Sequence, residues 1–559
     1  MIAGARSIAS LALLAAALAP SVAAAADDPA LQPPFGGQQP PPLKRVASDA
    51  RPAGFELSAG EATRFARTSK PFGEELAAEP SARAVPYLRG ENWQIELVSG
   101  RGEDSERLAF AVVEDATGDL REAWNDQQLG SELARGYDGA IAQTVNSPWL
   151  WIGLSLLFCL PFVDPRRPFR LLHLDLLALV GLGASLALYN QAEITASVAL
   201  TLPVLGYLLG RSLWTGLRPQ PQSGPLVPIV GVRVLAILAL ALGAGRIGLN
   251  VADSRVIDVG VAGVVGADRI ADGEELYGGE FSPGLDLRGD VYGPANYLAY
   301  APFEQAFSWE GVWEEVSAAH AAAIVFDLLS AVGLLLLGRR LRAGPEGRAL
   351  GVALAFAWLS YPFTLYTMNA NANDSLVAAL GIGALLAVRS APLRGAAVAV
   401  AALAKFGSAA TAPLFATGTG ERRRRDIAIF SLVFGLISIG LFAPFIPDGG
   451  VAEVYERTFG YQASRSSPFS LWGQAPSLEP LQAVARALAV LLAVTVAFVP
   501  ARRTVFQLAA LAAAVTIAVQ LTATHWFYFY VVWFLPFFLV ASFGETGGEE
   551  HPDAQARSV

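Results

Sequence analysis

The chain contains almost no cysteine, and this scarcity excludes two classes of structure. Its one cysteine, Cys159, lies inside an apolar run, so neither a disulfide framework nor a cysteine metal site can form within one chain. The four histidines are scattered without the spacing of metal ligands: His173, His320, His525 and His551. The sequence therefore predicts no cofactor, and nothing in it indicates a divalent metal.

Charge is also scarce, because Asp, Glu, Lys and Arg make up only 16% of the residues. No tract of basic residues lies outside the flanks of apolar segments, so nucleic acid is excluded as a partner. A mean hydropathy of +0.43 over 559 residues is too high for a water-soluble enzyme of this size and predicts a protein embedded mostly in lipid. The use of Arg in place of Lys, together with abundant Ala, suggests a bacterial protein.

The N-terminus has the features of a secretory signal peptide. Residues 1–26 contain Arg6, a short apolar stretch and a run of small residues before Asp27. An uncleaved first membrane helix is the alternative, although the apolar stretch is short for a bilayer. Residues 27–54 are rich in Pro, Gly and Gln and are predicted to form a disordered tether.

A small α+β domain is predicted outside the cytoplasm over residues 55–146. Ser58 and Glu61 can form a capping box that opens a short helix. Two segments then alternate apolar and polar residues: Trp93, Ile95 and Leu97 in the first, and Leu108, Phe110 and Val112 in the second. The order of helix, strands and an acidic turn resembles small extracytoplasmic PepSY-like domains, and a tethered domain without that relationship is equally compatible with it.

The remainder of the chain is dominated by apolar segments, about eleven of which approach the roughly 20 residues that a bilayer requires. These predicted spans cover residues 148–163, 171–189, 193–213, 226–250, 318–338, 349–368, 374–388, 426–446, 481–500, 504–521 and 525–543. The segment 395–418 is interrupted by Lys405, Gly407 and Pro413 and is predicted to be a re-entrant hairpin or two short broken helices.

Arginine placement predicts the orientation of these spans. Clusters of Arg fall in alternate connections, including 166–170, 339–348, 422–425 and 502–503, and such connections are expected in the cytoplasm. The long loops 251–317 and 447–480 are then extracytoplasmic and the acidic tail 544–559 is cytoplasmic. This orientation agrees with the predicted signal peptide, and it places the protein in the bacterial cytoplasmic membrane.

The loop 251–317 concentrates carboxylates beside a predicted span. Asp253 and Asp258 follow the end of that span closely, and the apolar, glycine-containing run after Asp258 can lie along the bilayer surface as an amphipathic helix. A carboxylate in that position can reach a lipid headgroup. Solvated loop acids without a function are the plainer interpretation of each Asp taken alone.

Several of these residues resemble a known family. The segment from Asp258 through GEELY (273–277), the Tyr292-Gly293-Pro294 segment, NANDSLV (371–377), the broken segment around Lys405 and HWFYFYVVWFLP (525–536) resemble polytopic C-type glycosyltransferases. They are most similar to glycosyltransferase family 87, which contains polyprenol-phosphate-mannose-dependent mannosyltransferases. The resemblance covers residues 226–543 and leaves out the N-terminal domain and three additional spans in 147–225. It departs from the family at DVGVAG (258–263), where an aromatic residue is usual.

The resemblance implies an α-helical membrane enzyme that transfers a sugar from a polyprenyl-phosphate donor to a lipid, glycan or protein acceptor. Asp258 would be the catalytic base that takes a proton from the acceptor hydroxyl, with Asp253 as the second candidate. The other candidates would bind the donor phosphate or sugar: Arg465, Arg255, Arg269, Tyr292, Tyr297, Asp374, His525 and Tyr528.

Alternatives remain open for individual residues and for the whole protein. Tyr292 and Tyr297 also fit an interfacial aromatic belt, and His525 and Asp374 fit helix caps. Asp327 and Lys405 lie in apolar segments, where Lys405 is predicted to extend to the cytoplasmic face. A transporter or flippase of lipid-linked saccharides, or a ligand-sensing scaffold, would share the composition and the topology.

Overall fold

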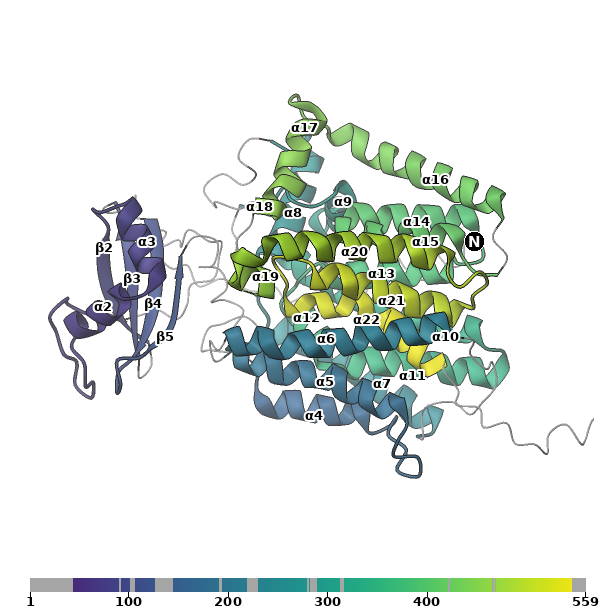
Figure 1. The fold of residues 1–559 in the computed structure, drawn as a ribbon, viewed down its shortest axis with the longest axis horizontal. Coiled ribbons are helices and arrows are strands. Elements are labelled where there is room, and N and C mark those ends of the chain that lie inside the picture. Colours follow the sequence, from purple (N-terminus) through teal and green to yellow (C-terminus); the bar gives the residue numbers. More distant parts are fainter. Residues whose placement is uncertain are drawn as a thin grey trace, which may run out of the picture.

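The computed structural model describes a small β-sheet domain and a large helical bundle (Figure 1). The described residues are 44–89, 92–100, 106–125, 144–190, 194–218, 230–278, 281, 289–311, 316–420, 423–464, 467 and 469–544. The predicted signal peptide and most of the predicted tether lie outside these residues. The helices of the bundle run side by side along its long axis, and the sheet domain lies beyond one end.

The N-terminal domain is a five-stranded antiparallel sheet with strand order β1-β2-β3-β4-β5. Its strands are β1 (Lys44–Arg45), β2 (Arg83–Arg89), β3 (Asn92–Ser99), β4 (Glu106–Glu114) and β5 (Leu120–Asn125). Helices α2 (Ala59–Arg67) and α3 (Lys70–Ala78) pack on one face through Ala62, Ala66 and Phe72. The predicted capping box at the start of α2 is confirmed, because Ser58 and Glu61 exchange both hydrogen bonds.

The residues of β4 that pack under the helices are not the alternating set noted in the sequence. Trp93, Ile95 and Leu97 of β3 pair with Val113, Ala111 and Ala109, and this alternate set packs under the two helices. Residues directly opposite each other in an antiparallel pair share a face, so Phe110 and Val112 lie on the other face. They are buried as well. Apolar residues occur on both faces of β4, because both faces are buried. The pattern of apolar residues in the sequence therefore cannot show which face packs against the helices.

Asp115 ties the start of α2 to the sheet. Its buried carboxylate accepts hydrogen bonds from the backbone N–H of Glu56 at 2.6 Å and of Leu57 at 3.0 Å, and from the Trp93 indole at 2.8 Å. We expect Asp115→Ala to destabilise the domain by about 3 kcal/mol or more, because three donors lose their acceptor. Faster amide exchange over residues 56–66 would show this. Asp119→Ala, at an exposed site, is the control; equal exchange in both variants would contradict the prediction.

The bundle contains long membrane-length helices and several shorter elements. The longer helices are α4 (Pro148–Cys159), α5 (Leu171–Asn190), α6 (Ile194–Leu217), α7 (Val232–Ala252), α8 (Asp258–Asp272), α9 (Pro294–Glu304), α10 (Ser317–Leu341), α11 (Gly344–Ser360), α13 (Asp374–Leu386), α14 (Ala391–Ala404), α16 (Arg424–Phe442), α20 (Glu479–Phe498), α21 (Val505–Leu521) and α22 (Val531–Gly544). The short ones are α12 (Pro362–Asn369), α15 (Ala412–Thr417), α17 (Gly450–Tyr455), α18 (Tyr461–Ser464) and α19 (Leu471–Gln474).

Six helices within the described residues are long and apolar enough to cross a membrane, as expected for a membrane protein. They are α5, α6, α7, α10, α16 with its 3₁₀ extension to Phe445, and α20 with the turn that precedes it from Pro476. The bent pair of α11 and α12, with an angle of 58°, makes seven if it counts as one span. The predicted number of about eleven spans is not supported. Four of the predicted spans, at α4, α13, α21 and α22, form helices of only 10–17 residues, which are shorter than a bilayer normally requires.

The segment predicted to be a broken hairpin does fold back on itself. Helix α14 ends at Lys405, and after a 3₁₀ turn over Phe406–Thr411 the chain continues into α15. The Arg394 guanidinium, near the start of α14, donates a 2.9 Å hydrogen bond to the Phe415 carbonyl in α15. The two ends therefore lie together, and Lys405 lies near the turn between the two arms.

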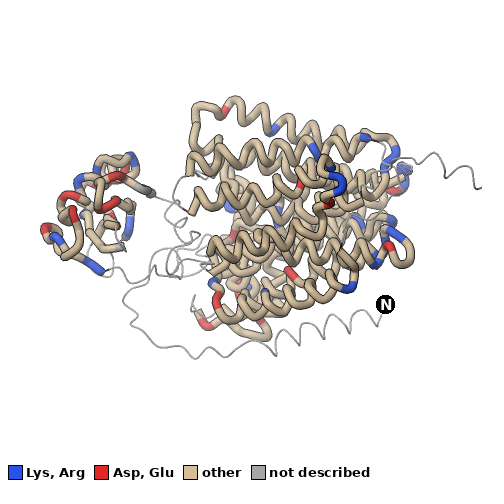
Figure 2. The backbone as a smooth tube through the Cα atoms, turned by 90° about the horizontal axis from the view of Figure 1, so that it is seen from below, with Lys and Arg blue, Asp and Glu red and all other residues tan. Residues whose placement is uncertain are grey.

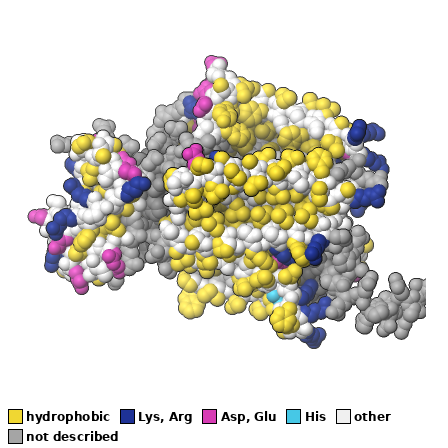
Figure 3. Space-filling view, viewed as in Figure 1, with side chains coloured by type: hydrophobic (Ala, Val, Ile, Leu, Met, Phe, Trp, Pro, Cys, Tyr) yellow, Lys and Arg dark blue, Asp and Glu magenta, His cyan; other side chains and the backbone are white. Residues whose placement is uncertain are grey.

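Exposed arginines gather mainly at the end of the bundle that faces away from the sheet domain (Figures 2 and 3). Exposed arginines lie in the connections that precede α5, α11, α14, α16 and α21 or in the helix turns beside them: Arg166, Arg167, Arg339, Arg340, Arg348, Arg389, Arg423, Arg424, Arg425 and Arg502. In contrast, the flanks of the bundle drawn in Figure 3 are largely hydrophobic. The bundle is thus apolar along its length and basic mainly at one end.

Buried ion pairs hold the helices together. The Asp327 carboxylate in α10 accepts hydrogen bonds from the Arg246 guanidinium of α7 at 2.6 Å and from the Trp358 indole of α11 at 2.9 Å. The sequence placed Asp327 in an apolar segment but did not identify Arg246 as its partner. A second pair joins Arg211 of α6 to Asp175 of α5 at 3.1 Å.

Candidate functional site

The loop between α7 and α8, which carries both candidate carboxylates, is held by the turn between α12 and α13. The backbone N–H of Ile257 donates to the Ala370 carbonyl at 3.2 Å, and the Asn369 side chain donates to the Asp253 carbonyl at 2.9 Å. Asn371 adds a 2.8 Å bond from its side-chain amide to the Arg255 carbonyl. Three consecutive residues, 369 to 371, thus fix the path of residues 253–257.

The backbone conformation at position 371 explains why the residue there is asparagine. Its φ of +52° lies in the left-handed region, which Asn adopts more readily than most residues. The Asn250 amide of α7 donates to the Asn371 side-chain oxygen at 2.9 Å, and the Ser254 hydroxyl lies 3.1 Å from its side-chain nitrogen. This buried amide pair positions the end of α7 against the turn.

Asp258 is the first residue of α8, and its side chain is exposed. Its carboxylate makes no hydrogen bond or ion pair with any residue in the described part of the chain. The N-terminus of a helix favours a negative charge there. Asp258 is therefore an ionisable oxygen ligand or base held on a fixed backbone and free to meet another molecule.

The apolar run after Asp258 is buried by protein and does not lie along a bilayer surface. Every residue from Gly260 to Ala267 is buried. Gly263 and Gly266 face the rings of Tyr300 and Tyr297 in α9 so closely that a Cβ atom at either position would collide with them. The small residues thus allow α8 to pack directly on α9, and the Tyr292-Gly293-Pro294 segment begins beside this contact.

A buried lysine and a buried aspartate form the centre of the second part of the site. Lys405 Nζ lies 2.6 Å from Asp374 Oδ1, and the Trp533 indole donates to the same oxygen at 2.7 Å. The rings of Tyr292, Tyr530 and Trp533 surround the ammonium group at 5.1–5.5 Å from their centroids. The prediction that Lys405 extends to the cytoplasmic face is wrong, because this local cage binds its charge.

Tyr292 connects the lysine cage to Asp258. Burial first, and then the nearby carboxylates of Asp258 and Asp374, raise the pKa of Tyr292 well above its ordinary value. Its phenol therefore stays protonated at neutral pH. We use the name candidate site for the six residues that meet here: Asp258, Tyr292, Asp374, Lys405, Tyr530 and Trp533. No protein-family model and no curated protein matches the chain.

Unpartnered polar atoms lie next to the candidate site. The Asn373 amide donates to the Asn296 side-chain oxygen at 2.9 Å, but Asn373 Oδ1 and Asn296 Nδ2 have no partner within the described residues. The Tyr300 hydroxyl is also buried without one. Buried polar atoms normally find partners, so these groups can serve a hydroxylated ligand or ordered water.

The remaining predicted residues are distributed around the candidate site. Asp253 is exposed and accepts a hydrogen bond from Thr144, four residues before the start of α4. Arg255 is exposed, and its guanidinium contacts no other described residue through a hydrogen bond or ion pair. Arg269 lies eleven positions after Asp258 on α8, about 16 Å along the helix axis, and it bonds the Glu275 and Phe281 carbonyls. Arg465 lies outside the described residues.

Three predicted aromatic or imidazole groups have other partners. The Tyr297 hydroxyl donates to the Gly289 carbonyl at 2.6 Å and is buried. The Tyr528 hydroxyl bonds Ser185 and Ser197, away from Lys405. His525 contacts Ser467 through Nδ1 at 2.9 Å, and its ring meets Tyr530 edge-on at 6.2 Å. His525 is thus linked to the candidate site through the ring of Tyr530, and the Tyr297 hydroxyl is linked to it by accepting a 3.2 Å hydrogen bond from the Tyr292 backbone N–H.

Sequence reasoning missed Tyr530, Trp533 and the partner of Lys405. The sequence feature that could have identified the two aromatic residues is the dense aromatic segment 525–533. Tyr530 and Trp533 are three positions apart in it and so share a helix face. No group of three or more His, Cys, Asp or Glu side chains in the described residues is arranged to hold a metal.

Gly293 sets the distance between the Tyr292 loop and α14. A Cβ atom there would collide with the Leu403 carbonyl, two residues before Lys405. Gly293→Ala should therefore push Tyr292 away from the lysine and destabilise the protein by about 1–3 kcal/mol, the usual cost of overpacking, which thermal unfolding in detergent would measure. Gly435→Ala, on an open face of α16, is the control. Equal unfolding temperatures of the two variants would show that the close approach is not required.

Proposed function

We propose that the protein is a membrane glycosyltransferase that transfers a sugar, with mannose as the first candidate, from a polyprenyl-phosphate donor to a lipid, glycan or protein acceptor outside the cytoplasm. One observation carries the proposal: Asp258, the first residue of α8, has an exposed carboxylate close enough to Tyr292 to raise its pKa, and Tyr292 belongs to the buried Lys405 cage. A base and a cation in adjacent positions are the two groups that this reaction needs.

Each group has a defined task in the proposed reaction. The acceptor hydroxyl attacks the anomeric carbon of the sugar, and Asp258 takes the hydroxyl proton as the new C–O bond forms. The bond between the anomeric carbon and the phosphate oxygen breaks, and polyprenyl phosphate leaves with the bonding electrons. Lys405 and the exposed Arg255 stabilise the phosphate charge, while the neutral Tyr292 phenol donates a hydrogen bond.

The unpartnered amides support recognition of a sugar. Asn296 Nδ2 is a buried donor and Asn373 Oδ1 is a buried acceptor, so each can bond a sugar hydroxyl without losing a protein partner. Asp374 follows Asn373 directly, which keeps these amides close to the lysine cage. The sugar would thus lie between Asp258 and Lys405.

The distribution of charge supports the orientation of the proposed reaction. Exposed arginines gather at the end of the bundle away from the sheet domain, and such residues favour the cytoplasmic side. Asp253 contacts Thr144, next to the start of α4, so the candidate loop belongs to the end that faces the sheet domain. In a bacterial cytoplasmic membrane, this end would face outward, where lipid-linked sugars replace nucleotide sugars as donors.

The test is sugar transfer by the purified full chain. Radiolabelled polyprenyl-phosphate mannose is incubated with the protein and a bacterial lipid extract, and labelled GDP-mannose is the control donor. Labelled lipid-soluble or glycan product from the polyprenyl donor alone supports the proposal. Saturable donor binding without product would instead favour the transporter, and the absence of both would favour a sensing scaffold.

A further inference from the structure

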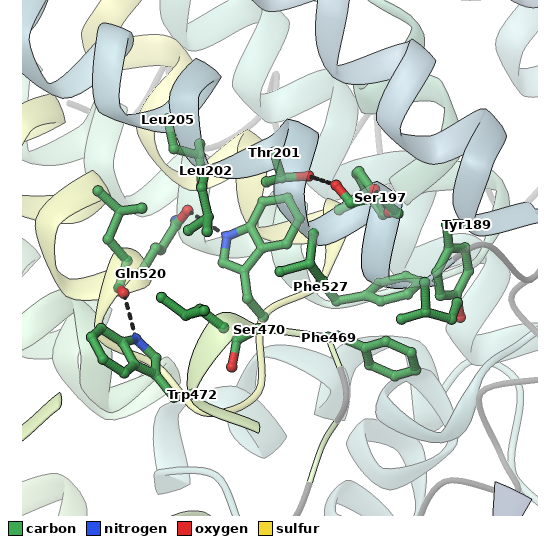
Figure 4. Close-up of a pocket in the computed structure, with 16 residues that line it drawn as sticks. Tyr189, Ser197, Thr201, Leu202, Leu205, Phe469, Ser470, Trp472, Gln520 and Phe527 are labelled. Atoms are coloured by element: carbon green, nitrogen blue, oxygen red, sulfur yellow. Dashed lines mark hydrogen bonds between the residues drawn. The ribbon is translucent and has the colours of Figure 1, made fainter. Parts of the chain in front are cut away.

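A second site lies on the flank of the bundle, between the helices that precede α7 and the C-terminal part of the chain. A pocket with about 480 Å³ of empty space is lined by α6, by the connection into α19, by the end of α21 and by residues 526–528 (Figure 4). This space includes open solvent, so the pocket is a narrow groove that is open on one side and not an enclosed cavity.

The walls of the pocket are apolar and carry no ionisable acid or base other than the tyrosines. Val198, Leu202 and Leu205 of α6 face Phe469, Trp472 and Trp526, as Figure 4 shows for most of them. Such walls fit a hydrocarbon chain and disfavour a sugar or a phosphate, which would lose water without gaining partners.

The polar atoms of the lining are already bonded to protein. The Tyr528 hydroxyl bonds Ser197 at 2.5 Å, and the Trp472 indole donates to the Leu521 carbonyl at 2.8 Å. The Gln520 side chain donates to the Tyr530 carbonyl at 2.8 Å. A ligand in the pocket would therefore be held by its hydrocarbon surface.

An exposed arginine marks one edge of the pocket. Ser470, a lining residue, donates to the Thr524 carbonyl at 2.6 Å, and Arg486 of α20 donates to the Thr524 hydroxyl at 3.2 Å. Arg486 is exposed, and so are the apolar side chains of its neighbours on α20. The exposed fractions of Val484 and Leu488 are 54% and 59%. A guanidinium on an apolar, membrane-length helix is best satisfied by a lipid phosphate at the membrane surface.

This pocket is separate from the candidate site. Residues 526–530 form the wall between them: Tyr528 points to Ser197 on one side, and Tyr530 contacts Lys405 on the other. A molecule with its phosphate at Arg486 would therefore occupy a different place from a donor with its phosphate at Lys405.

We propose that the pocket binds a glycerophospholipid, with one acyl chain along α6 and the phosphate at Arg486. The chain replaces water against the aromatic lining, and the phosphate gains a charge-assisted hydrogen bond. The lipid joins α6 to α19 and α20, so it ties the first helices of the bundle to the segment that carries Tyr530. This inference does not depend on the proposed sugar transfer.

The experiment uses the full chain in phosphatidylcholine vesicles that contain phosphatidylglycerol with a photoreactive diazirine at the end of one acyl chain. Crosslinked peptides are mapped after irradiation. We expect saturable labelling of residues 194–205 and 526–528, displaced by unlabelled phosphatidylglycerol. Arg486→Gln should raise the mole fraction needed for half-saturation about tenfold, the effect of losing one charge-assisted bond. Val198→Trp, which fills the pocket, should abolish saturable labelling.

Leu436→Trp, on the exposed face of α16, is the matched control and should leave the labelling unchanged. Labelling spread evenly over all exposed helix faces, or unaffected by Val198→Trp, would overturn the proposal. Displacement by polyprenyl phosphate at a lower mole fraction than by phosphatidylglycerol would also overturn it, because the pocket would then be an isoprenoid site. The competition in the wild-type chain gives an answer even if a variant does not fold.

Discussion

Asp258→Asn is expected to lower sugar transfer by about 100- to 10,000-fold, the usual contribution of a general base. The amide has nearly the shape of the carboxylate but cannot take a proton at neutral pH. Asp258 is exposed and makes no contact that holds another described residue, so the fold should be unaffected. The measurement is the initial rate of labelled product with donor and acceptor at saturation, compared with wild type.

Asp253→Asn is the matched control, because it lies five residues earlier on the same loop. Its carboxylate bonds Thr144 next to α4, and the neutral amide can keep a hydrogen bond to that hydroxyl. We expect transfer by this variant to stay within about threefold of wild type, as for loss of a peripheral hydrogen bond. If Asp253→Asn fails and Asp258→Asn remains active, the roles of the two acids are reversed.

Donor binding separates the role of a base from that of a ligand. Asp258→Asn should bind polyprenyl-phosphate mannose as tightly as wild type, since removing one negative charge does not weaken attraction to a phosphate. An unchanged KM with a lowered kcat would fit a group that acts only as the bond forms. A loss of donor binding with kcat retained would assign Asp258 to substrate binding.

Local features were predictable where they depend on neighbours in sequence. The capping box needs only Ser58 and Glu61, and the interruption of the 395–418 segment follows from Lys405, Gly407 and Pro413. The position of Asp258 at the edge of the membrane domain followed likewise from the end of an apolar segment. In each case the physical cause lies within a few residues.

Contacts between distant segments were not predictable. Lys405 and Asp374 are 31 residues apart, and Trp533 is 159 residues from Asp374, so no periodicity connects them. The predicted number of membrane spans was too high for a related reason. Apolar residues in α13 and α22 are buried against other helices, and burial in protein requires the same composition as burial in lipid.

Breaking the buried pair at the candidate site is expected to have the largest effect on stability. Lys405→Met should cost about 3–5 kcal/mol, because Asp374 would remain buried with only the Trp533 indole as a donor. Lys405 and Asp374 side chains are 8% and 2% exposed, so water cannot replace the lost partner. Thermal unfolding of the purified protein in detergent measures the loss.

The double variant Lys405→Met/Asp374→Leu distinguishes structure from function. Replacing both charges with apolar groups should recover most of the stability, since a buried ion pair contributes little over well-packed apolar residues. Sugar transfer should stay at least about 100-fold below wild type, because the cation that stabilises the leaving phosphate is gone. Recovery of both stability and transfer would make the pair purely structural.

Arg246→Met/Asp327→Leu provides the matched comparison, because it removes a buried pair of the same 2.6 Å length between α7 and α10. Neither of its residues belongs to the candidate site. Both double variants should unfold at similar temperatures, so any difference in transfer arises from chemistry at Lys405 and Asp374. Equal transfer by the two double variants would remove Lys405 from the proposed mechanism and leave Arg255 as the cation nearest to Asp258 in the sequence.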